Sequence, residues 1–327
     1  MKNVLSEIKS LYSLDLHSPE KVERGFLSEN HILTDGIAKY FLKKYRFDRE
    51  EKVAEIHAAK RYFSDGGIPV ILPIVSNNGK TFFYYDGAYF ALFPFISGKH
   101  IKRDEFTEAA VVSMGEMLGK IHLLGIKSAL PVEDYFSGWD KQKFLAKADL
   151  ILSIINEKAE LDDFDKKALQ TIMFRKELIE KNNTSFEDLH LPNDCLIHGD
   201  YHEMNIFFDE YDNVQHVFDW EKITLAPRMF ELLRSVIYVF FDESFDDRNV
   251  SLARTYITAY KNVIPTSNEE LIKGLQLFHL RQLHGFWVEN EHYLKNNYKV
   301  DHFLISRSDT TKYMAEHLDE LAKKLFD

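Results

Sequence analysis

Three side chains that carry ligand oxygens lie in and shortly after one polar loop of the sequence. Asp200 and Asn205 fall within LIHGDYHEMNIFFD (residues 196–209), between two apolar, strand-like runs. Asp219 ends the next such run, in VQHVFDWEK (residues 214–222), and a hairpin would return it to the side of Asn205. A few carboxylate and amide oxygens suit Mg²⁺, which keeps waters and shares phosphate oxygens. Asp200 would then accept a proton from a substrate hydroxyl.

The spacing of these residues is that of a kinase catalytic loop. In kinases an Asp precedes a metal-binding Asn by five residues, and a second metal-binding Asp follows. With HGDYHEMN and the later Asp219-Trp220-Glu221, the chain resembles the aminoglycoside phosphotransferase and choline kinase family. The resemblance implies Asp200 as the catalytic base, Asn205 and Asp219 as ligands of Mg²⁺, ATP as phosphate donor and a small-molecule alcohol as acceptor. We expect His198 to orient the loop rather than to transfer protons.

The resemblance also predicts a phosphate-binding cation on a strand of the N-terminal part. Lys43 in KYFLKKY occupies that place, while the alternation of strand side chains should point Lys44 the other way. The expected partner of Lys43 is a carboxylate on the following helix. Glu55 fits best, and Glu51, one turn earlier, is the alternative.

Further nucleotide contacts are expected from two segments of the N-terminal part. The turn in GFLSENHIL should cover the phosphates, with Ser28 and Asn30 as the residues that match the family in character. The stretch ALFPFISGKHI resembles the family's hinge between lobes, where adenine would bond to backbone groups near Phe93 and Phe95. The alternative for both rings is apolar strand core.

The elements that must position these residues change in type along the chain. Residues 20–97 read as a small antiparallel sheet with one helix: strands at GFLSENHIL, IAKYFLKKYRF, IPVILPIVS, TFFYYDG and AYFALFPFIS, and a helix from an Asp48 cap to Gly66-Gly67. Beyond residue 97 the pattern is helical, with short strands at 194–198, 205–209 and 214–219. We therefore expect an α+β, bilobal, protein-kinase-like fold, with a nucleotide-binding lobe at 1–97 and a catalytic and substrate lobe at 98–327.

Composition and charge exclude several classes of protein. The 327 residues are 45% hydrophobic and 28% charged, as in ordinary globular proteins. The net charge of −11 argues against non-specific nucleic-acid binding. The N-terminus has no signal-peptide pattern and no run suits a membrane span, so a soluble, cytoplasmic protein is expected. The single cysteine, Cys195, fits a reducing compartment and reads as a buried apolar residue.

The acceptor is the least determined part of the prediction. Residues 1–97 carry a net charge of +1 and the remainder −12, which favours a cationic amino-alcohol or aminoglycoside-like acceptor if the acceptor docks on the second part. Neutral and anionic alcohols stay open as acceptors. Two alternatives stay open: a Ser/Thr protein kinase of the same fold, and a non-catalytic nucleotide-binding or structural relative of the spore-coat type. Candidate acceptor contacts are acids and aromatic residues: Glu203, Glu221, Asp242, Glu243, Trp287, Glu289, Glu291 and Tyr293.

Overall fold

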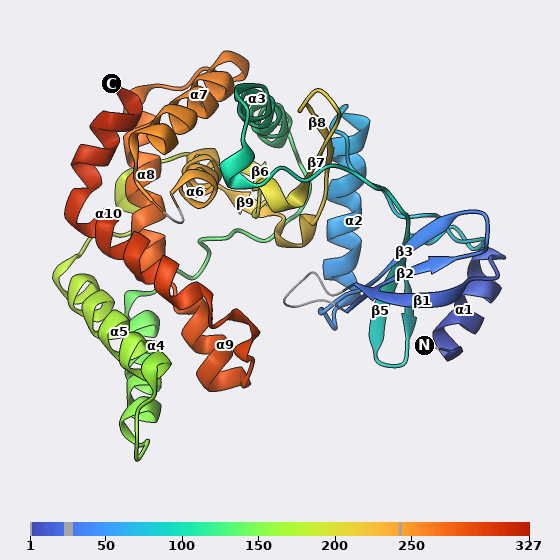
Figure 1. Ribbon diagram of the computed structural model, residues 1–327, viewed down its shortest axis with the longest axis horizontal. Coiled ribbons are helices and arrows are strands. Elements are labelled where there is room, and N and C mark those ends of the chain that lie inside the picture. Colours follow the sequence, from blue (N-terminus) through green and yellow to red (C-terminus); the bar gives the residue numbers. More distant parts are fainter. Residues whose placement is uncertain (1, 23–28, 242–243) are drawn as a thin grey trace. The chain divides into compact units, whose positions relative to one another are not determined.

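An antiparallel sheet forms the N-terminal part of the chain (Figure 1). The computed structural model describes residues 2–22, 29–241 and 244–327. Its five strands lie in the order β1-β2-β3-β5-β4. Their bounds are β1 His17–Val22, β2 Asn30–Thr34, β3 Lys39–Lys44, β4 Phe83–Tyr85 and β5 Ala88–Pro94. Turns at Asp35-Gly36 and Asp86-Gly87 join β2 to β3 and β4 to β5.

Two helices accompany this sheet. α1 (Lys2–Tyr12) packs Val4, Ile8 and Tyr12 into a core with strand residues such as Leu33 and Leu42. α2 (Glu50–Asp65) begins after Arg49 rather than after the predicted cap Asp48, and Gly66 ends it as predicted. Its buried residues contact the sheet, since Nζ of Lys60 lies 4.0 Å from the centroid of the Phe93 ring in β5.

The sequence reading of the sheet is wrong in two places. The stretch IPVILPIVS (68–76) forms only an isolated bridge, from Val70 to Val217, because Pro69 and Pro73 supply no N–H to a ladder. The strand β1 was not predicted, because its sequence HSPEKV is polar and contains Pro19. Its side chains are almost all exposed, which is typical of a short strand at the edge of a sheet.

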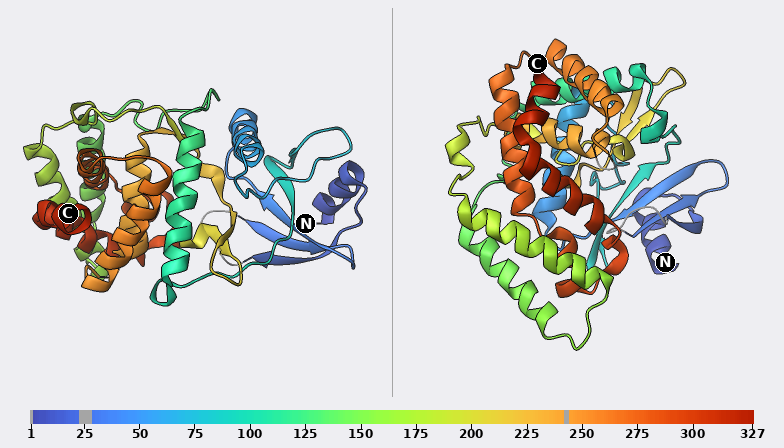
Figure 2. Two further views of the ribbon diagram at one scale, coloured as in Figure 1. Left: turned by 90° about the horizontal axis from the view of Figure 1, so that it is seen from above. Right: turned by 60° about the vertical axis from the view of Figure 1, so that its left-hand side comes forward.

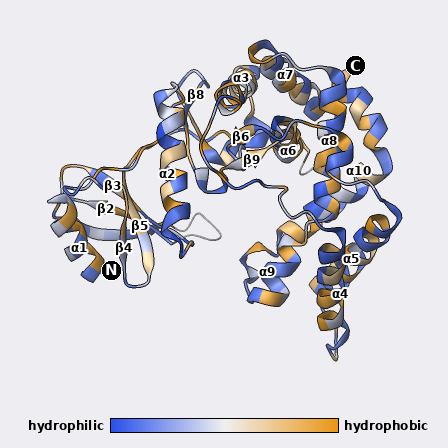
Figure 3. Ribbon diagram, turned by 180° about the vertical axis from the view of Figure 1, so that it is seen from behind, coloured by the Kyte–Doolittle hydropathy of each residue, from blue (hydrophilic) through white to orange (hydrophobic). Residues whose placement is uncertain are grey.

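The rest of the chain is mainly helical, as predicted. The helices are α3 Glu108–Gly125, α4 Lys141–Asn156, α5 Asp163–Lys181, α6 Arg228–Phe240, α7 Asp247–Val263, α8 Asn268–Leu283, α9 Trp287–Lys295 and α10 Phe303–Phe326. Figure 2 shows α4 and α5 as a pair of neighbouring helices, and α5 also contacts α10. Apolar residues recur between polar ones along α4 and α5 (Figure 3), and their buried members form a core with α9 and α10.

Two short hairpin-like pairs interrupt the helices. β6 (Cys195–Ile197) pairs with β9 (Thr224–Ala226), a strand that sequence reasoning missed. β7 (Ile206–Phe208) pairs with β8 (Val214–Val217), as the predicted hairpin requires. Within the described part of the chain, no helix has the length and apolar character needed to cross a membrane.

The chain packs into two compact units that each draw on several segments. The first contains Met1–Ser113, Lys127–Val132 and His198–Ile223, and the second contains Met114–Ile126, Glu133–Ile197 and Thr224–Asp327. The polar loop, the β7–β8 hairpin and the sheet therefore belong to one unit. The functional division at residues 97 and 98 stays a prediction.

Candidate active site

The polar loop after β6 turns sharply at a glycine. Gly199 has φ +81°, and a Cβ placed on it would lie 2.0 Å from the carbonyl oxygen of Lys222. Only glycine combines that left-handed backbone with so close an approach. The loop and the segment after β8 are therefore in direct backbone contact.

His198 connects the loop by hydrogen bonds to Phe218, the residue before Asp219. Its Nδ1 accepts a hydrogen bond from the Asp200 N–H at 3.2 Å, so Nε2 carries the proton and donates to the carbonyl oxygen of Phe218 at 2.9 Å. The ring is fully buried and lies 4.5 Å from that of Trp220. Proton transfer by this ring would break both backbone contacts, so the geometry supports an orienting role.

The β7–β8 hairpin brings Asp219 close to Asn205. The N–H of Phe218 donates to the carbonyl oxygen of Asn205 at 3.0 Å, and Ile206 pairs with Val217. The Asn205 side chain donates through Nδ2 to the carbonyl oxygen of Asp200 at 2.9 Å, which leaves Oδ1 as its atom for a cation. Asp219 has a left-handed backbone, with φ 58° and ψ 57°, and this directs the chain out of β8.

Lys43 joins this hairpin to the sheet through two carboxylates. Its Nζ lies 3.0 Å from Oδ1 of Asp219 and 2.7 Å from Oε1 of Glu221. Burial disfavours the ammonium charge, but the two carboxylates outweigh it and raise the pKa of Lys43 above its ordinary value. Arg46 adds a second cation, with Nε 3.5 Å from Oε2 of Glu221. The pKa of Asp219 is lowered because Lys43 outweighs the effect of burial.

The expected pair of Lys43 with Glu55 does not form in the structure. Glu55 instead bonds to Lys52, three residues earlier on α2, and Glu51 is exposed. Glu221, with 7% of its side chain exposed, stands beside Lys43 in place of a carboxylate from the helix. Lys44 pairs with Glu29, so it points away from Lys43 as predicted.

Asp200 lies within the same loop and has a cationic neighbour. Oδ2 of Asp200 is 2.9 Å from Nζ of Lys222 and 3.8 Å from Nε2 of His202. Sequence reasoning missed Lys222, although its position directly after Asp219-Trp220-Glu221 was a usable signal. The ammonium of Lys222 offsets the negative charge of this carboxylate, and a carboxylate of this kind can accept a proton.

The structure adds a second lysine near the predicted adenine contacts. Lys60 of α2 is buried, with Nζ 4.0 Å from the centroid of the Phe93 ring. Burial, reinforced by Lys43, lowers the pKa of Lys60 well below its ordinary value. No sequence signal separated Lys60 from the other helix lysines.

The remaining nucleotide-binding predictions receive uneven support. Asn30 starts β2 opposite Lys43, and its Oδ1 is buried without a protein partner in the described residues. Phe93 is buried in β5. The N–H of Phe95 donates to the carbonyl oxygen of Lys39 at 3.2 Å, so this N–H is already bonded to a strand of the sheet. Ser28 lies outside the described residues.

The predicted acceptor contacts are largely engaged elsewhere. Glu203 is buried beside Arg103, whose Nε lies 2.8 Å from Oε1. Glu291 bonds to Lys295 and Asn297, and Trp287 packs against the core of the second unit. Glu289 pairs with Arg175 in that unit, Tyr293 bonds to Asp165, and Asp242 and Glu243 lie outside the described residues.

The oxygen ligands near Asn205 and Asp219 are few. Across residues 2–22, 29–241 and 244–327, no three or more His, Cys, Asp and Glu side chains are arranged to hold a metal ion. A cation here would take one amide and one carboxylate oxygen from the protein and complete its shell with phosphate and water. That donor set fits Mg²⁺.

Comparison with known proteins identifies a family. The family model of the phosphotransferase enzyme family matches residues 20–268. Stress response kinase A of Escherichia coli (strain K12) is 31% identical over 91 residues, which are 27% of this chain and 27% of that protein. The matched region thus spans about a quarter of this curated relative.

Solved structures match over nearly the whole chain. Amicoumacin kinase hAmiN, in complex with AMP-PNP, Ca²⁺ and Ami, has a TM-score of 0.64 at 14% identity, covering 100% of this chain and 95% of that one. A microcompartment-associated aminopropanol kinase has a TM-score of 0.62 at 13% identity, covering 98% and 99%. At these identities the likeness concerns the fold, and it confirms the predicted α+β, protein-kinase-like fold.

Proposed function

Because the chain belongs to the phosphotransferase enzyme family, we propose that it transfers the γ-phosphate of ATP to a hydroxyl group of a small molecule, with Mg²⁺ as cofactor. One observation carries the proposal. Lys43 of the sheet is held 3.0 Å from Asp219, which the β7–β8 hairpin returns to the loop that holds Asp200 and Asn205. Phosphoryl transfer relies mainly on positioning and charge neutralisation, and this arrangement supplies both.

Lys43 is the residue proposed to bind phosphate. Its raised pKa keeps the side chain charged throughout the physiological range, and 14% of the side chain is exposed. Glu221 is proposed to position this ammonium rather than to contact the acceptor, since its carboxylate faces Lys43 and Arg46. Asn30 lies opposite Lys43 in the sheet and so on the same face, and its amide oxygen has no hydrogen-bond partner among the described residues.

Asn205 and Asp219 are proposed to hold Mg²⁺. Nδ2 of Asn205 is fixed on the backbone of Asp200, so its Oδ1 is oriented by the loop. Asp219 offers the oxygen that does not bond to Lys43. When bound, the ion would offset negative charge on the phosphates.

Asp200 is proposed as the base that accepts the proton of the acceptor hydroxyl. Its backbone is fixed by His198, and its carboxylate is held by Lys222. An oriented base is usually worth about 10²–10⁴ in rate. Lys222 would stay beside the carboxylate before transfer and when the proton arrives.

We propose a cationic amino-alcohol or aminoglycoside-like acceptor. The net charge of −12 over residues 98–327 favours approach of a cation. Two of the fold neighbours bear the names of an amicoumacin kinase and an aminopropanol kinase, and this supports a small acceptor. The proposed location of this activity is the cytoplasm.

A panel assay tests the function. Purified full-length protein is incubated with ATP, with and without Mg²⁺, and with amino-alcohols, aminoglycosides, neutral alcohols or a generic protein substrate. We expect Mg-dependent ATP consumption with a hydroxylated amine, and loss of turnover with retained ATP binding in Asp200→Asn. Phosphate found only on the protein substrate would identify a Ser/Thr protein kinase instead.

Two outcomes contradict the proposal outright. Wild-type turnover by a folded Asp200→Asn variant would refute the assignment of the base. Nucleotide binding without transfer to any member of a broad acceptor panel would favour a non-catalytic nucleotide-binding relative.

A further inference from the structure

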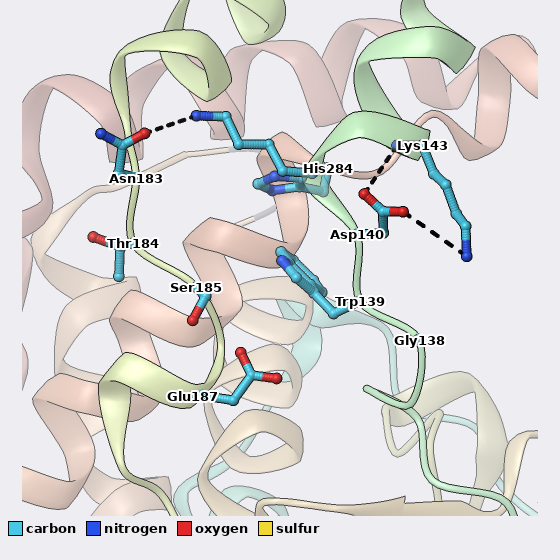
Figure 4. A pocket seen from close by; sticks show the side chains of 10 residues that line it. Gly138, Trp139, Asp140, Lys143, Asn183, Thr184, Ser185, Glu187 and His284 are labelled. Atoms are coloured by element: carbon cyan, nitrogen blue, oxygen red, sulfur yellow. Dashed lines mark hydrogen bonds and ion pairs between the residues drawn. The ribbon is translucent and has the colours of Figure 1, made fainter.

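A cavity of about 500 Å³ lies within the second compact unit (Figure 4). Its walls come from the start of α4, from residues 183–187 between α5 and β6, and from His284 at the end of α8. All of these segments belong to the second unit, so the cavity is a property of that unit alone. None of its residues belongs to the proposed phosphotransfer site.

The frame of the cavity is held by polar contacts at the start of α4. Nζ of Lys141 donates to the carbonyl oxygens of Glu180 and Asn182 at 3.3 and 2.9 Å and to Oδ1 of Asn183 at 3.1 Å. Asp140 caps α4 by accepting from the N–H groups of Gln142 and Lys143. The cations and the helix N–H groups at this end are thus partnered, and the frame is not an anion site.

One wall of the cavity is aromatic. The rings of Trp139 and His284 lie 4.5 Å apart, and the Phe144 ring lies 5.1 Å from Trp139 and 4.8 Å from His284. Figure 4 shows the Trp139 and His284 rings side by side. Trp139 is only half-buried, so one part of its ring remains open to a ligand.

His284 provides a hydrogen-bond acceptor at this wall. Its Nδ1 lies 2.8 Å from the carbonyl oxygen of Leu280, and a carbonyl can only accept, so Nδ1 carries the proton. Burial lowers the pKa of His284, and the ring therefore stays neutral with Nε2 as an acceptor. His284 is only 4% exposed, and no group of the described residues donates a hydrogen bond to its Nε2.

Glu187 provides a negative charge across from the aromatic wall. It is exposed, begins the short helix Glu187–Leu189, and forms no ion pair or side-chain hydrogen bond with the described residues. In Figure 4 its carboxylate lies on the same side of the cavity as Ser185, facing Trp139. An aromatic face beside a free carboxylate suits an organic ammonium group.

We propose that this cavity binds a small hydroxylated amine, with its ammonium at Glu187 and Trp139 and a hydroxyl donating to Nε2 of His284. The binding itself does not depend on the proposed phosphotransfer. A ligand of this chemistry can be the phosphate acceptor or an effector that is not turned over. The acceptor case rests on the proposed function.

Direct binding to the full-length protein tests the proposal. The probe is 2-deoxystreptamine, an aminocyclitol, with myo-inositol as the ring that lacks amines and cyclohexylamine as the ring that lacks hydroxyls. Titration calorimetry measures affinity, and a change in tryptophan fluorescence that is lost in Trp139→Phe reports on Trp139 rather than on Trp220 or Trp287. We expect 2-deoxystreptamine to bind more tightly than either comparison compound.

A conservative substitution locates the binding. Glu187→Gln should weaken binding of 2-deoxystreptamine roughly three- to ten-fold, whereas Glu160→Gln, at another exposed glutamate of the same unit, should not. Equal affinity in wild type and Glu187→Gln, or equal affinity for myo-inositol, would overturn the proposal. Glu187 is exposed, so its replacement leaves the fold intact, and thermal unfolding verifies this.

Measurements with Asp200→Asn and Glu187→Gln distinguish a ligand that is the phosphate acceptor from an effector that is not turned over. Unchanged binding by Asp200→Asn supports a site in the cavity, and binding that depends on Asp200 but not on Glu187 would refute it. Phosphorylation of the probe by wild type, reduced by Glu187→Gln, identifies the acceptor. Binding without phosphorylation identifies an effector, and it leaves the proposed function to be judged by the acceptor panel.

Discussion

Replacing Gly199 by alanine should damage the proposed catalytic loop far more than an equivalent change elsewhere. Gly199 has φ +81°, and the new Cβ would lie 2.0 Å from the carbonyl oxygen of Lys222. Real Cβ atoms essentially never approach within 3.0 Å of such an atom, so the two segments must separate by about 1 Å. The side chain of Lys222 holds Asp200, and the separation therefore moves the proposed base.

Gly79 supplies a matched control for the backbone conformation. It also has φ +81°, but a Cβ there would meet nothing within 4 Å. Both substitutions should cost about 1–2 kcal/mol of folding free energy for a left-handed L-residue. Only Gly199→Ala should add the displacement, and a misplacement of about 1 Å can cost roughly 10²-fold in rate.

Turnover and stability of the two variants should be measured together. With the acceptor found in the panel assay, we expect kcat/KM of Gly199→Ala to fall roughly 10²-fold below that of Gly79→Ala. Thermal unfolding should show both variants folded at the assay temperature. Equal kcat/KM for the two folded variants would refute the coupling between the loop backbone, Lys222 and Asp200.

Three further outcomes follow from the same contacts. Asp219→Ala should abolish the Mg²⁺ dependence of nucleotide binding in titration calorimetry, and unchanged affinity would contradict its metal role. Glu221→Gln should raise the KM for ATP several-fold and Glu55→Gln should not, since of these two glutamates Glu221 contacts Lys43 and Glu55 contacts Lys52. The reverse order would restore the helix carboxylate as the partner of Lys43. Burial, then Lys60 and Lys43, lowers the pKa of His57 to about 3. Between about pH 6.5 and pH 3 the unfolded state therefore binds a proton at His57 that the folded state does not bind. The free energy of unfolding should accordingly decrease as the pH is lowered through this range. Urea titrations should show a smaller decrease for His57→Gln.

The sequence was most informative where a local pattern has one structural meaning. Asp86-Gly87 between apolar runs predicts a hairpin, and β4 and β5 form it. The spacing of Asn205 and Asp219 across two short strands predicts their approach, and β7 pairs with β8 accordingly. In both cases the residues that decide the structure are close in sequence.

The partner of Lys43 shows where such reasoning stops. A glutamate on the next helix was the natural expectation, but Lys52 lies one turn from Glu55 and forms an ion pair with it. Glu221 is close to Lys43 only because the β7–β8 hairpin contacts the segment that follows α2, where the N–H of Val217 bonds to the carbonyl oxygen of Pro69. No local pattern records a contact of that kind.

The same packing has a consequence for the order in which the chain folds during synthesis. Lys43 and Asp219 are 176 residues apart, and the unit that holds the sheet also contains His198–Ile223. The ribosome must therefore produce most of the protein before the first unit can close around Lys43. Until then the Lys43 ammonium lacks both carboxylates, and contacts of such long range form slowly. A nascent chain arrested before residue 198 should accordingly be more sensitive to proteolysis in its N-terminal sheet than one that extends past residue 223.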